Sequence, residues 1–410
     1  MIKNKKNFLL ENSINKIYYN ANLYTKDKIK LKKIIENIFN NLDNKKDTFH
    51  VLSKKFIFNL KVSKLKKFKK YNSVVLIGMG GSVLGARSIY SFLRHKIKKN
   101  FIFLDNLDHS KVEIIKKETH IKKSLFIIIS KSGNTIETLI NSSLLKDNIN
   151  SKNTIIITEK KKNLLNTFAK NKKILHIEHK KYIGGRYSVL SEVGVVPSYF
   201  MGIKTNNLRT DLHSFFKTKQ KTILIESVVK LFHIHKLKKI KSIIFLNYAP
   251  ELNKFLYWCQ QLIAESLGKK GKGILPLISP APRDHHSLLQ MYLDGPRDKL
   301  FYIFSLNLNK KMNINSKVFG ESFKFLENKE LSKVILSQKK ALTNVLKRKK
   351  IPYREFKINK INEEVLGELF SYFMLETTLI GKLIGINPFN QPAVEEVKIL
   401  TKKYLNQKSK

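Results

Sequence analysis

Short, continuous apolar runs alternate with helical patterns along most of this sequence, and this alternation constrains the fold more than any other feature. A strand whose residues are all apolar is buried on both faces, as strands are in parallel sheets covered by helices on both sides. The first block of the chain holds five such runs at the spacing of strand–helix units. They are residues 74–77, 101–104, 125–129, 154–157 and 174–177.

A second block repeats the pattern with strands expected at 242–246, 300–306 and 353–358 and helices expected at 250–267, 362–384 and 391–405. The chain of 410 residues is long enough for more than one domain. The sequence therefore predicts an α/β fold with two domains, each a parallel sheet between helices. The expected division is an N-terminal helical segment at 1–72, a first domain at 73–205, a helical link at 206–241, a second domain at 242–386 and a C-terminal helix within 387–410.

The chain is strongly basic, with 79 Lys and Arg against 31 Asp and Glu and a formal charge of +48. Only eight of the basic residues are Arg, and the Lys residues are spread along the whole chain with many Asn and Ile. Nucleic-acid surfaces use Arg heavily, because its fork pairs with phosphate and guanine. We therefore interpret most of the Lys residues as solvated surface and expect no specific nucleic-acid partner.

The sequence also limits the cellular setting that we expect. Cys259 is the only cysteine, which excludes a disulfide framework and a cysteine-based metal site. The N-terminus lacks the apolar core of a signal peptide, and the strongest apolar run, 125–129, is too short to span a bilayer. We therefore expect a soluble, cytoplasmic protein with no membrane contact.

A serine loop, residues 130–135, follows the third expected strand and opens a helix. The unpaired N–H groups of a helix N-terminus attract anions, and ligands bind at the carboxyl ends of parallel strands. Ser130, Ser132 and Thr135 add hydroxyl groups there, and Lys131 adds a positive charge. This loop predicts a phosphate site without the spacing of a nucleotide P-loop. The alternative is ordinary helix capping by Ser and Thr.

Two further glycine-containing segments lie at expected strand ends. The glycine turn, residues 78–82, follows the first strand, where its backbone N–H groups could face the carbon skeleton of a ligand. Arg186 follows two glycines after the fifth strand and could oppose an oxyanion that forms during a reaction. The alternatives are close packing for the glycines and a surface turn for the arginine.

The second block contains further candidates. Gln261 and Glu265 lie four residues apart and share one face of an expected helix, although Glu265 could equally pair with Lys269. His285 and His286 are adjacent, and local sequence does not choose between them. Lys398, near the C-terminus, is inconspicuous in so Lys-rich a chain.

Taken together and in order, these segments resemble the glucose-6-phosphate isomerase family. The resemblance rests on six segments between residues 74 and 400: the glycine turn, 130–138, 184–188, 264–269, 284–287 and 390–398. It implies two sugar-isomerase (SIS) domains and a homodimer with active sites at the subunit contact. It also implies reversible conversion of glucose 6-phosphate to fructose 6-phosphate in glycolysis and gluconeogenesis, without a metal or cofactor.

The resemblance also implies roles for single residues. Glu265 matches the catalytic base, Arg186 the arginine beside the reacting carbons, and His286 the ring-opening histidine that reaches in from the neighbouring subunit. Lys398 matches the C-terminal lysine that assists ring opening. The residues that match substrate-binding positions are Gly80, Gly81, Ser82, Ser130, Lys131, Ser132, Thr135, Gln261 and Gln391.

These residue types suit an aldose–ketose exchange. One carboxylate can move a proton between C2 and C1, a histidine–lysine pair can open the sugar ring, and an arginine can oppose the charge of the cis-enediol(ate). The chain departs from the family pattern at Asn390, where Asp is frequent, and at Ala393, where Gly is usual. The loss of a charge near Lys398 puts the orientation of that lysine in doubt.

Two alternatives remain open at this point. A dual phosphoglucose/phosphomannose isomerase would share the fold and the glutamate-based mechanism. The charge of +48 also suits a polyanion-binding or regulatory protein on a degenerate isomerase fold. The presence of all four candidate catalytic side chains argues against the second alternative.

Overall fold

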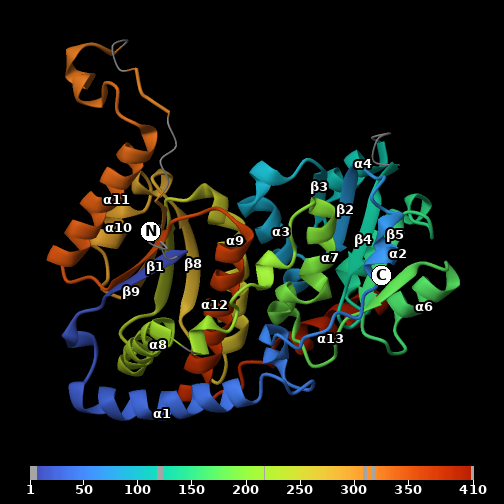
Figure 1. The fold of residues 1–410 in the computed structure, drawn as a ribbon, viewed down its shortest axis with the longest axis horizontal. Coiled ribbons are helices and arrows are strands. Elements are labelled where there is room, and N and C mark those ends of the chain that lie inside the picture. The colour runs from blue at the N-terminus through green and yellow to red at the C-terminus, as the bar shows by residue number, and fades with distance from the viewer. Residues whose placement is uncertain (1–6, 118–122, 217, 308–311, 316–318, 408–410) are drawn as a thin grey trace, which may run out of the picture.

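The computed structural model describes residues 7–117, 123–216, 218–307, 312–315 and 319–407. In this part of the chain, two five-stranded sheets lie side by side, and helices cover the faces of each sheet (Figure 1). The α/β class and the presence of two sheets are confirmed.

The first sheet has the strand order β3-β2-β4-β5-β6, and all its strands are parallel. Along β2, which has a strand on each side, Val74 and Leu76 enter one apolar cluster while Val75 and Ile77 enter another on the opposite face. This two-sided burial explains why the strand reads as one continuous apolar run. The strands are β2 (Ser73–Gly78), β3 (Asn100–Leu104), β4 (Leu125–Ile129), β5 (Thr154–Thr158) and β6 (Leu175–Glu178), as the five apolar runs predict.

The helices of the first block connect these strands and supply both clusters. Val112 and Ile115 of α4 and Leu165 of α6 pack on the face that carries Val75 and Ile77. The opposite face packs against α3 and α7, which belong to the larger cluster that continues into the second block. These helices are α3 (Leu84–Phe92), α4 (His109–Lys117), α5 (Ile136–Leu144), α6 (Leu164–Asn171) and α7 (Glu192–Met201).

The second sheet has the order β1-β10-β9-β7-β8, with β1 antiparallel to β10 and the other pairs parallel. Its strands are β1 (Phe8–Ser13), β7 (Ser242–Asn247), β8 (Leu275–Pro280), β9 (Lys299–Leu306) and β10 (Tyr353–Ile358). Its helices are α8 (Thr218–Leu237), α9 (Asn253–Leu267), α10 (Leu289–Leu293), α11 (Leu331–Arg348) and α12 (Glu363–Leu383). The expected strands β7, β9 and β10 and the expected helices α9 and α12 are confirmed.

Two strands correct the expectations. The N-terminal segment is not only helical, because β1 precedes α1 (Ala21–Asn40) and α2 (Val62–Lys66) and forms an antiparallel edge of the second sheet. Its residues alternate between partly buried and exposed, so they form no continuous apolar run. Strand β8 contains Pro276 and Pro280. Proline argues against a central strand but is tolerated at a sheet edge, where β8 lies.

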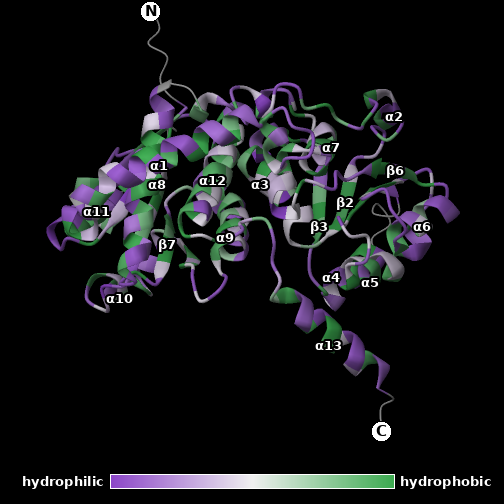
Figure 2. Cartoon of the chain, turned by 90° about the horizontal axis from the view of Figure 1, so that it is seen from below, coloured by the Kyte–Doolittle hydropathy of each residue, from purple (hydrophilic) through white to green (hydrophobic). Residues whose placement is uncertain are grey.

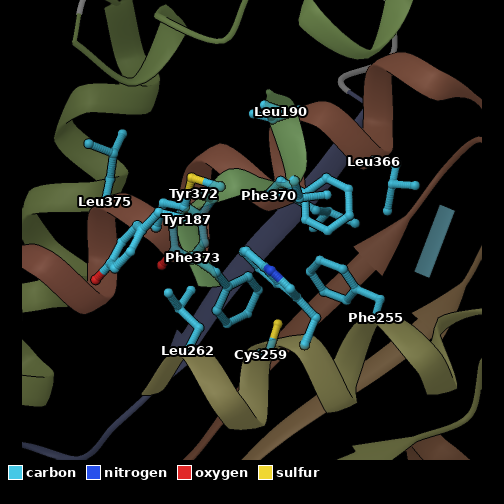
Figure 3. Packing of buried hydrophobic residues seen from close by; sticks show 14 of the residues in the cluster. Tyr187, Leu190, Phe255, Cys259, Leu262, Leu366, Phe370, Tyr372, Phe373 and Leu375 are labelled. Carbon is cyan, nitrogen blue, oxygen red and sulfur yellow. The ribbon is translucent and has the colours of Figure 1, made fainter. Parts of the chain in front are cut away.

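Helix α9 joins the two units and supports the site described below. Its Lys254 carbonyl accepts a hydrogen bond from Ser88 Oγ of α3 at 2.9 Å. Figure 3 shows Phe255, Cys259 and Leu262 of α9 packed against Phe370 and Phe373 of α12. None of the described helices is long and apolar enough to cross a membrane.

Candidate active site

The serine loop and the glycine turn lie next to each other, because β2 and β4 are neighbours in the sheet. Strand β2 is followed by β3 on one side, and β4 and β5 continue on the other side, so the chain reverses its direction of strand addition here. Ligands of open parallel sheets bind at such a switch point, beyond the carboxyl ends of the strands. A Cβ atom on Gly78 would lie 2.8 Å from the Ile129 carbonyl oxygen, which shows how closely the two segments approach.

Hydroxyl groups shape the serine loop from within. The Oγ atoms of Ser130 and Thr135 lie 2.8 Å apart, and Ser130 Oγ accepts a hydrogen bond from the Gly133 N–H at 3.1 Å. Ser132 Oγ accepts from the Asn134 N–H at 3.2 Å. Thr135 occupies the N-cap position of α5, but its side chain caps no N–H group there. The loop is thus preorganised by its own hydroxyls, and the first turn of α5 keeps donors for an anion.

Lys131 brings a half-buried positive charge to this loop. Its Nζ lies 3.8 Å from Glu159, which Lys161 approaches more closely at 2.5 Å. Burial lowers the pKa of Lys131, and the positive charges of Lys161 and Arg186 lower it further against the opposing effect of Glu159. Lys131 and Arg186 therefore contribute to one electropositive region, which suits a phosphate group.

Arg186 is the most constrained side chain of the site. It lies in the 3₁₀ helix Gly185–Leu190 and is only 3% exposed. Its Nε donates to Ser266 Oγ at 2.8 Å, and its Nη2 donates to the carbonyl groups of Pro388 at 2.7 Å and Asn390 at 3.2 Å. A guanidinium held by this many acceptors has a fixed direction, so its charge is placed in advance for any anion that forms beside it.

Glu265 lies between a cation and an amide. Arg186 Nη1 donates to Glu265 Oε2 at 3.1 Å, and Gln261 Nε2 donates to Glu265 Oε1 at 2.9 Å. The Glu265 side chain remains 33% exposed, whereas that of Arg186 is 2% exposed. The expected shared face of Gln261 and Glu265 is therefore present, and the carboxylate is oriented yet reachable from solvent.

The glycine turn fits against both of these partners. Gly80 has a φ of +51°, and a Cβ atom there would lie 2.6 Å from Gln261 Nε2. A Cβ atom on Gly81 would lie 2.3 Å from the Gly185 carbonyl carbon and 2.5 Å from the Arg186 nitrogen. The close approach that glycine permits thus brings the first sheet against α9 and against the arginine turn, residues 184–188. Ser82 ends this turn and is buried.

The segment between α12 and α13 (Val394–Asn406) completes the surroundings of Arg186. Gln391 Oε1 accepts from Arg186 Nη1 at 2.9 Å. Lys269, considered above only as a partner for Glu265, donates from Nζ to the Asn390 carbonyl at 2.6 Å. Burial and the charge of Arg186 lower the pKa of Lys269 to about 8, while Glu265 opposes this shift. Lys269 is a site residue that sequence reasoning missed, and its spacing from Glu265 was the available signal.

Two expected site residues do not join this cluster within one chain. His286 is exposed in the turn after β8. Lys398 lies on α13 (Val394–Asn406), which projects from the body in Figure 2, and its Nζ pairs with Glu395 at 2.6 Å. In the described part of the chain, neither side chain has a hydrogen bond or ion pair with Glu265 or Arg186.

The described residues also contain no group of three or more His, Cys, Asp or Glu side chains that could hold a metal ion. The assembled cluster consists instead of one oriented carboxylate, a fixed guanidinium, an amide and a hydroxyl-rich loop with a lysine. Such a set can hold an anionic substrate, move a proton and oppose a developing negative charge.

Comparisons with known proteins agree with this arrangement. Residues 13–274 match the phosphoglucose isomerase family. A glucose-6-phosphate isomerase of Methanocaldococcus jannaschii is 34% identical over 375 residues, which cover 88% of this chain and 91% of the relative. A glucose-6-phosphate isomerase of Mycoplasmopsis synoviae is 34% identical over 351 residues, covering 80% and 81% of the two chains.

Solved structures show the same fold. A hypothetical protein of Thermus thermophilus superposes with a TM-score of 0.81 at 23% identity and covers 97% of this chain and 100% of its own. A glucose-6-phosphate isomerase of Chlamydia trachomatis superposes with a TM-score of 0.76 at 15% identity, covering 98% of this chain and 89% of its own. Together with the matched sequence, these findings establish that the chain belongs to the phosphoglucose isomerase family.

Proposed function

We propose that this protein interconverts glucose 6-phosphate and fructose 6-phosphate in glycolysis and gluconeogenesis, in the cytoplasm. The observation that carries the proposal is the Glu265 carboxylate, which is oriented by Gln261 and Arg186. This carboxylate lies at the end of α9, and the glycine turn and the arginine turn meet it from the other sheet. The family membership supplies the substrate.

Glu265 is the proposed base for the isomerisation itself. Its carboxylate removes the proton from C2 of the open-chain aldose and returns it to C1, so one group serves both carbons and Glu265 ends unchanged. The hydroxyl proton on O2 passes to O1 in the same sequence, which turns the C1 carbonyl into a hydroxyl and the C2 hydroxyl into a carbonyl. The intermediate is a cis-enediol(ate), whose negative charge Arg186 opposes from a fixed position. Gln261 holds the other carboxylate oxygen, which keeps the base directed at the two carbons.

The serine loop is the proposed phosphate site. The hydroxyls of Ser130, Ser132 and Thr135, the start of α5 and the charge of Lys131 together offer donors to a dianion. The phosphate takes no part in the chemistry. Its binding holds the reacting end of the sugar in place, so that binding energy from a remote group lowers the barrier.

Ring opening is assigned in this proposal to His286 from a second copy of the chain, assisted by Lys398. Apolar side chains are exposed on the edge strand β8, on α9 and on the segment after β8 that carries His286, which favours a subunit contact there. They are Tyr257, Leu277, Leu288 and Met291, between 38% and 52% exposed. A homodimer through this surface would cover these side chains and place His286 at the neighbouring site.

The test is a coupled assay of fructose 6-phosphate conversion to glucose 6-phosphate, run with EDTA on the wild type and on Glu265→Gln. We expect metal-independent turnover in the wild type and a loss of about 10²-fold or more in the variant, as for removal of a general base. Glu321→Gln makes the same change at an exposed carboxylate and should leave turnover unchanged. An inactive wild type would refute the proposed reaction, and a fully active Glu265→Gln would refute the assignment of the base.

A further inference from the structure

A large cavity lies between the C-terminal end of α8, the loop that leads into β8 and the C-terminal end of α12. Its volume is about 1020 Å³, at the upper end of the range of roughly 300–1,000 Å³ for small-molecule sites. Ala264 and Gly268 of α9 line it, but Gln261, Glu265 and Arg186 are not among its described lining residues. The cavity therefore lies beside the candidate active site, with Ala264 next to Glu265 in the chain, but does not contain these three side chains.

The lining of this cavity is basic and contains no Asp or Glu among its described residues. In the described ion pairs, Lys236 alone among the lining cations has an acidic partner, Asp27 at 3.6 Å. Within the described part of the chain, none of the other lining lysines forms an ion pair with a carboxylate. The basic side chains of the lining are His235, Lys236, Lys238, Lys241, Lys270 and Lys272.

The lysines of this lining raise the positive potential at the histidine among them. His235 is half-buried, and burial together with the charges of Lys272 and Lys238 lowers its pKa. Lys272 Nζ is held in place by the Ile384 carbonyl at 2.7 Å. Like charges gathered in a concavity raise its electrostatic potential and attract an anion more strongly than the same charges spread over a convex surface.

The cavity also has an apolar wall. Phe232, Ile240 and Leu383 line it and are 5%, 4% and 6% exposed. Lys238, Lys241 and Lys272 all line this one cavity, and a chain of phosphates offers them more acceptor oxygens than a single phosphate does. We propose that this cavity binds the polyphosphate group of a small organic molecule, with nucleoside di- and triphosphates as the ligand class. The proposal does not depend on the isomerase reaction.

The test is isothermal titration calorimetry of the full-length protein with sodium tripolyphosphate, ATP and adenosine, each without magnesium. The test variant is Lys238→Gln/Lys241→Gln, which changes two exposed cavity lysines. The control is Lys32→Gln/Lys33→Gln, which removes the same charge from exposed positions of α1. We expect both polyphosphates to bind and adenosine to bind far more weakly. The dissociation constant should rise about tenfold or more in the test variant and by less than about twofold in the control.

The isomerase activity of the test variant should remain that of the wild type, which verifies that its active site is intact. ATP binding more tightly than tripolyphosphate would place the nucleoside on the apolar wall, and equal affinities would mean that the phosphates alone are recognised. Equal weakening in both double variants would overturn the proposal, because it would show a diffuse charge effect. The proposal would also be overturned if neither polyphosphate bound at millimolar concentration. The same holds if single-stranded RNA, titrated in parallel, bound while the two polyphosphates did not.

Discussion

The contact between the glycine turn and the arginine turn predicts a large effect of one added methyl group. In Gly81→Ala, the new Cβ would lie 2.3 Å from the Gly185 carbonyl carbon and 2.5 Å from the Arg186 nitrogen. Both are backbone atoms, so no side-chain rotation relieves the clash and the two turns must move apart. Such overpacking costs about 1–3 kcal/mol of the free energy of unfolding. Since Arg186 moves with its backbone, a displacement near 1 Å should lower kcat about 10²-fold.

The matched control is Gly185→Ala, on the other side of the same contact. A Cβ atom there meets no heavy atom within 4 Å, so we expect near-wild-type stability and turnover. The measurements are kcat and KM in the coupled assay and the free energy of unfolding in urea. If Gly81→Ala retained the kcat and stability of Gly185→Ala, the claim that this approach positions Arg186 would be refuted.

Two further predictions concern the subunit contact and Lys269. When Glu265→Gln and His286→Ala are refolded together in equal amounts, about half of the dimers are hybrids, and each hybrid has one complete site of two. The mixture should therefore recover about a quarter of wild-type activity. If it were no more active than the two variants alone, a histidine supplied by the partner would be excluded. The pKa of Lys269 is lowered from 10.5 to about 8, so kcat/KM should fall above pH 8, and Lys269→Arg but not Lys270→Arg should shift this limb upward. In the unfolded chain this lysine keeps its proton to higher pH, so it makes the free energy of unfolding rise between pH 8 and 10.5. If the pH limb of Lys269→Arg did not shift, the need for a protonated Lys269 would be contradicted.

The sequence by itself determined the class of fold and the strands that both faces bury. The apolar runs at 74–77 and 125–129 became β2 and β4, because a strand covered by helices on both sides favours apolar residues at every position. The serine loop and the glycine turn could be placed in advance at the carboxyl ends of these strands. By contrast, β1 and β8 lie at sheet edges, where partial exposure and proline remove the apolar signal.

Only the tertiary structure decided how the separate segments meet. Arg186 and Gln391 are 205 residues apart in the chain, yet a hydrogen bond of 2.9 Å joins them. No local pattern encodes this contact, because it depends on how α9 and α12 pack between the two sheets. The same holds for Lys269, which donates to the Asn390 carbonyl, whereas the sequence offered a pairing with Glu265 only as an alternative. Within one chain, no described hydrogen bond or ion pair links His286 or Lys398 to Glu265, because His286 is exposed after β8 and Lys398 pairs with Glu395 on α13. In the proposed homodimer, the second copy of the chain brings His286 to the site.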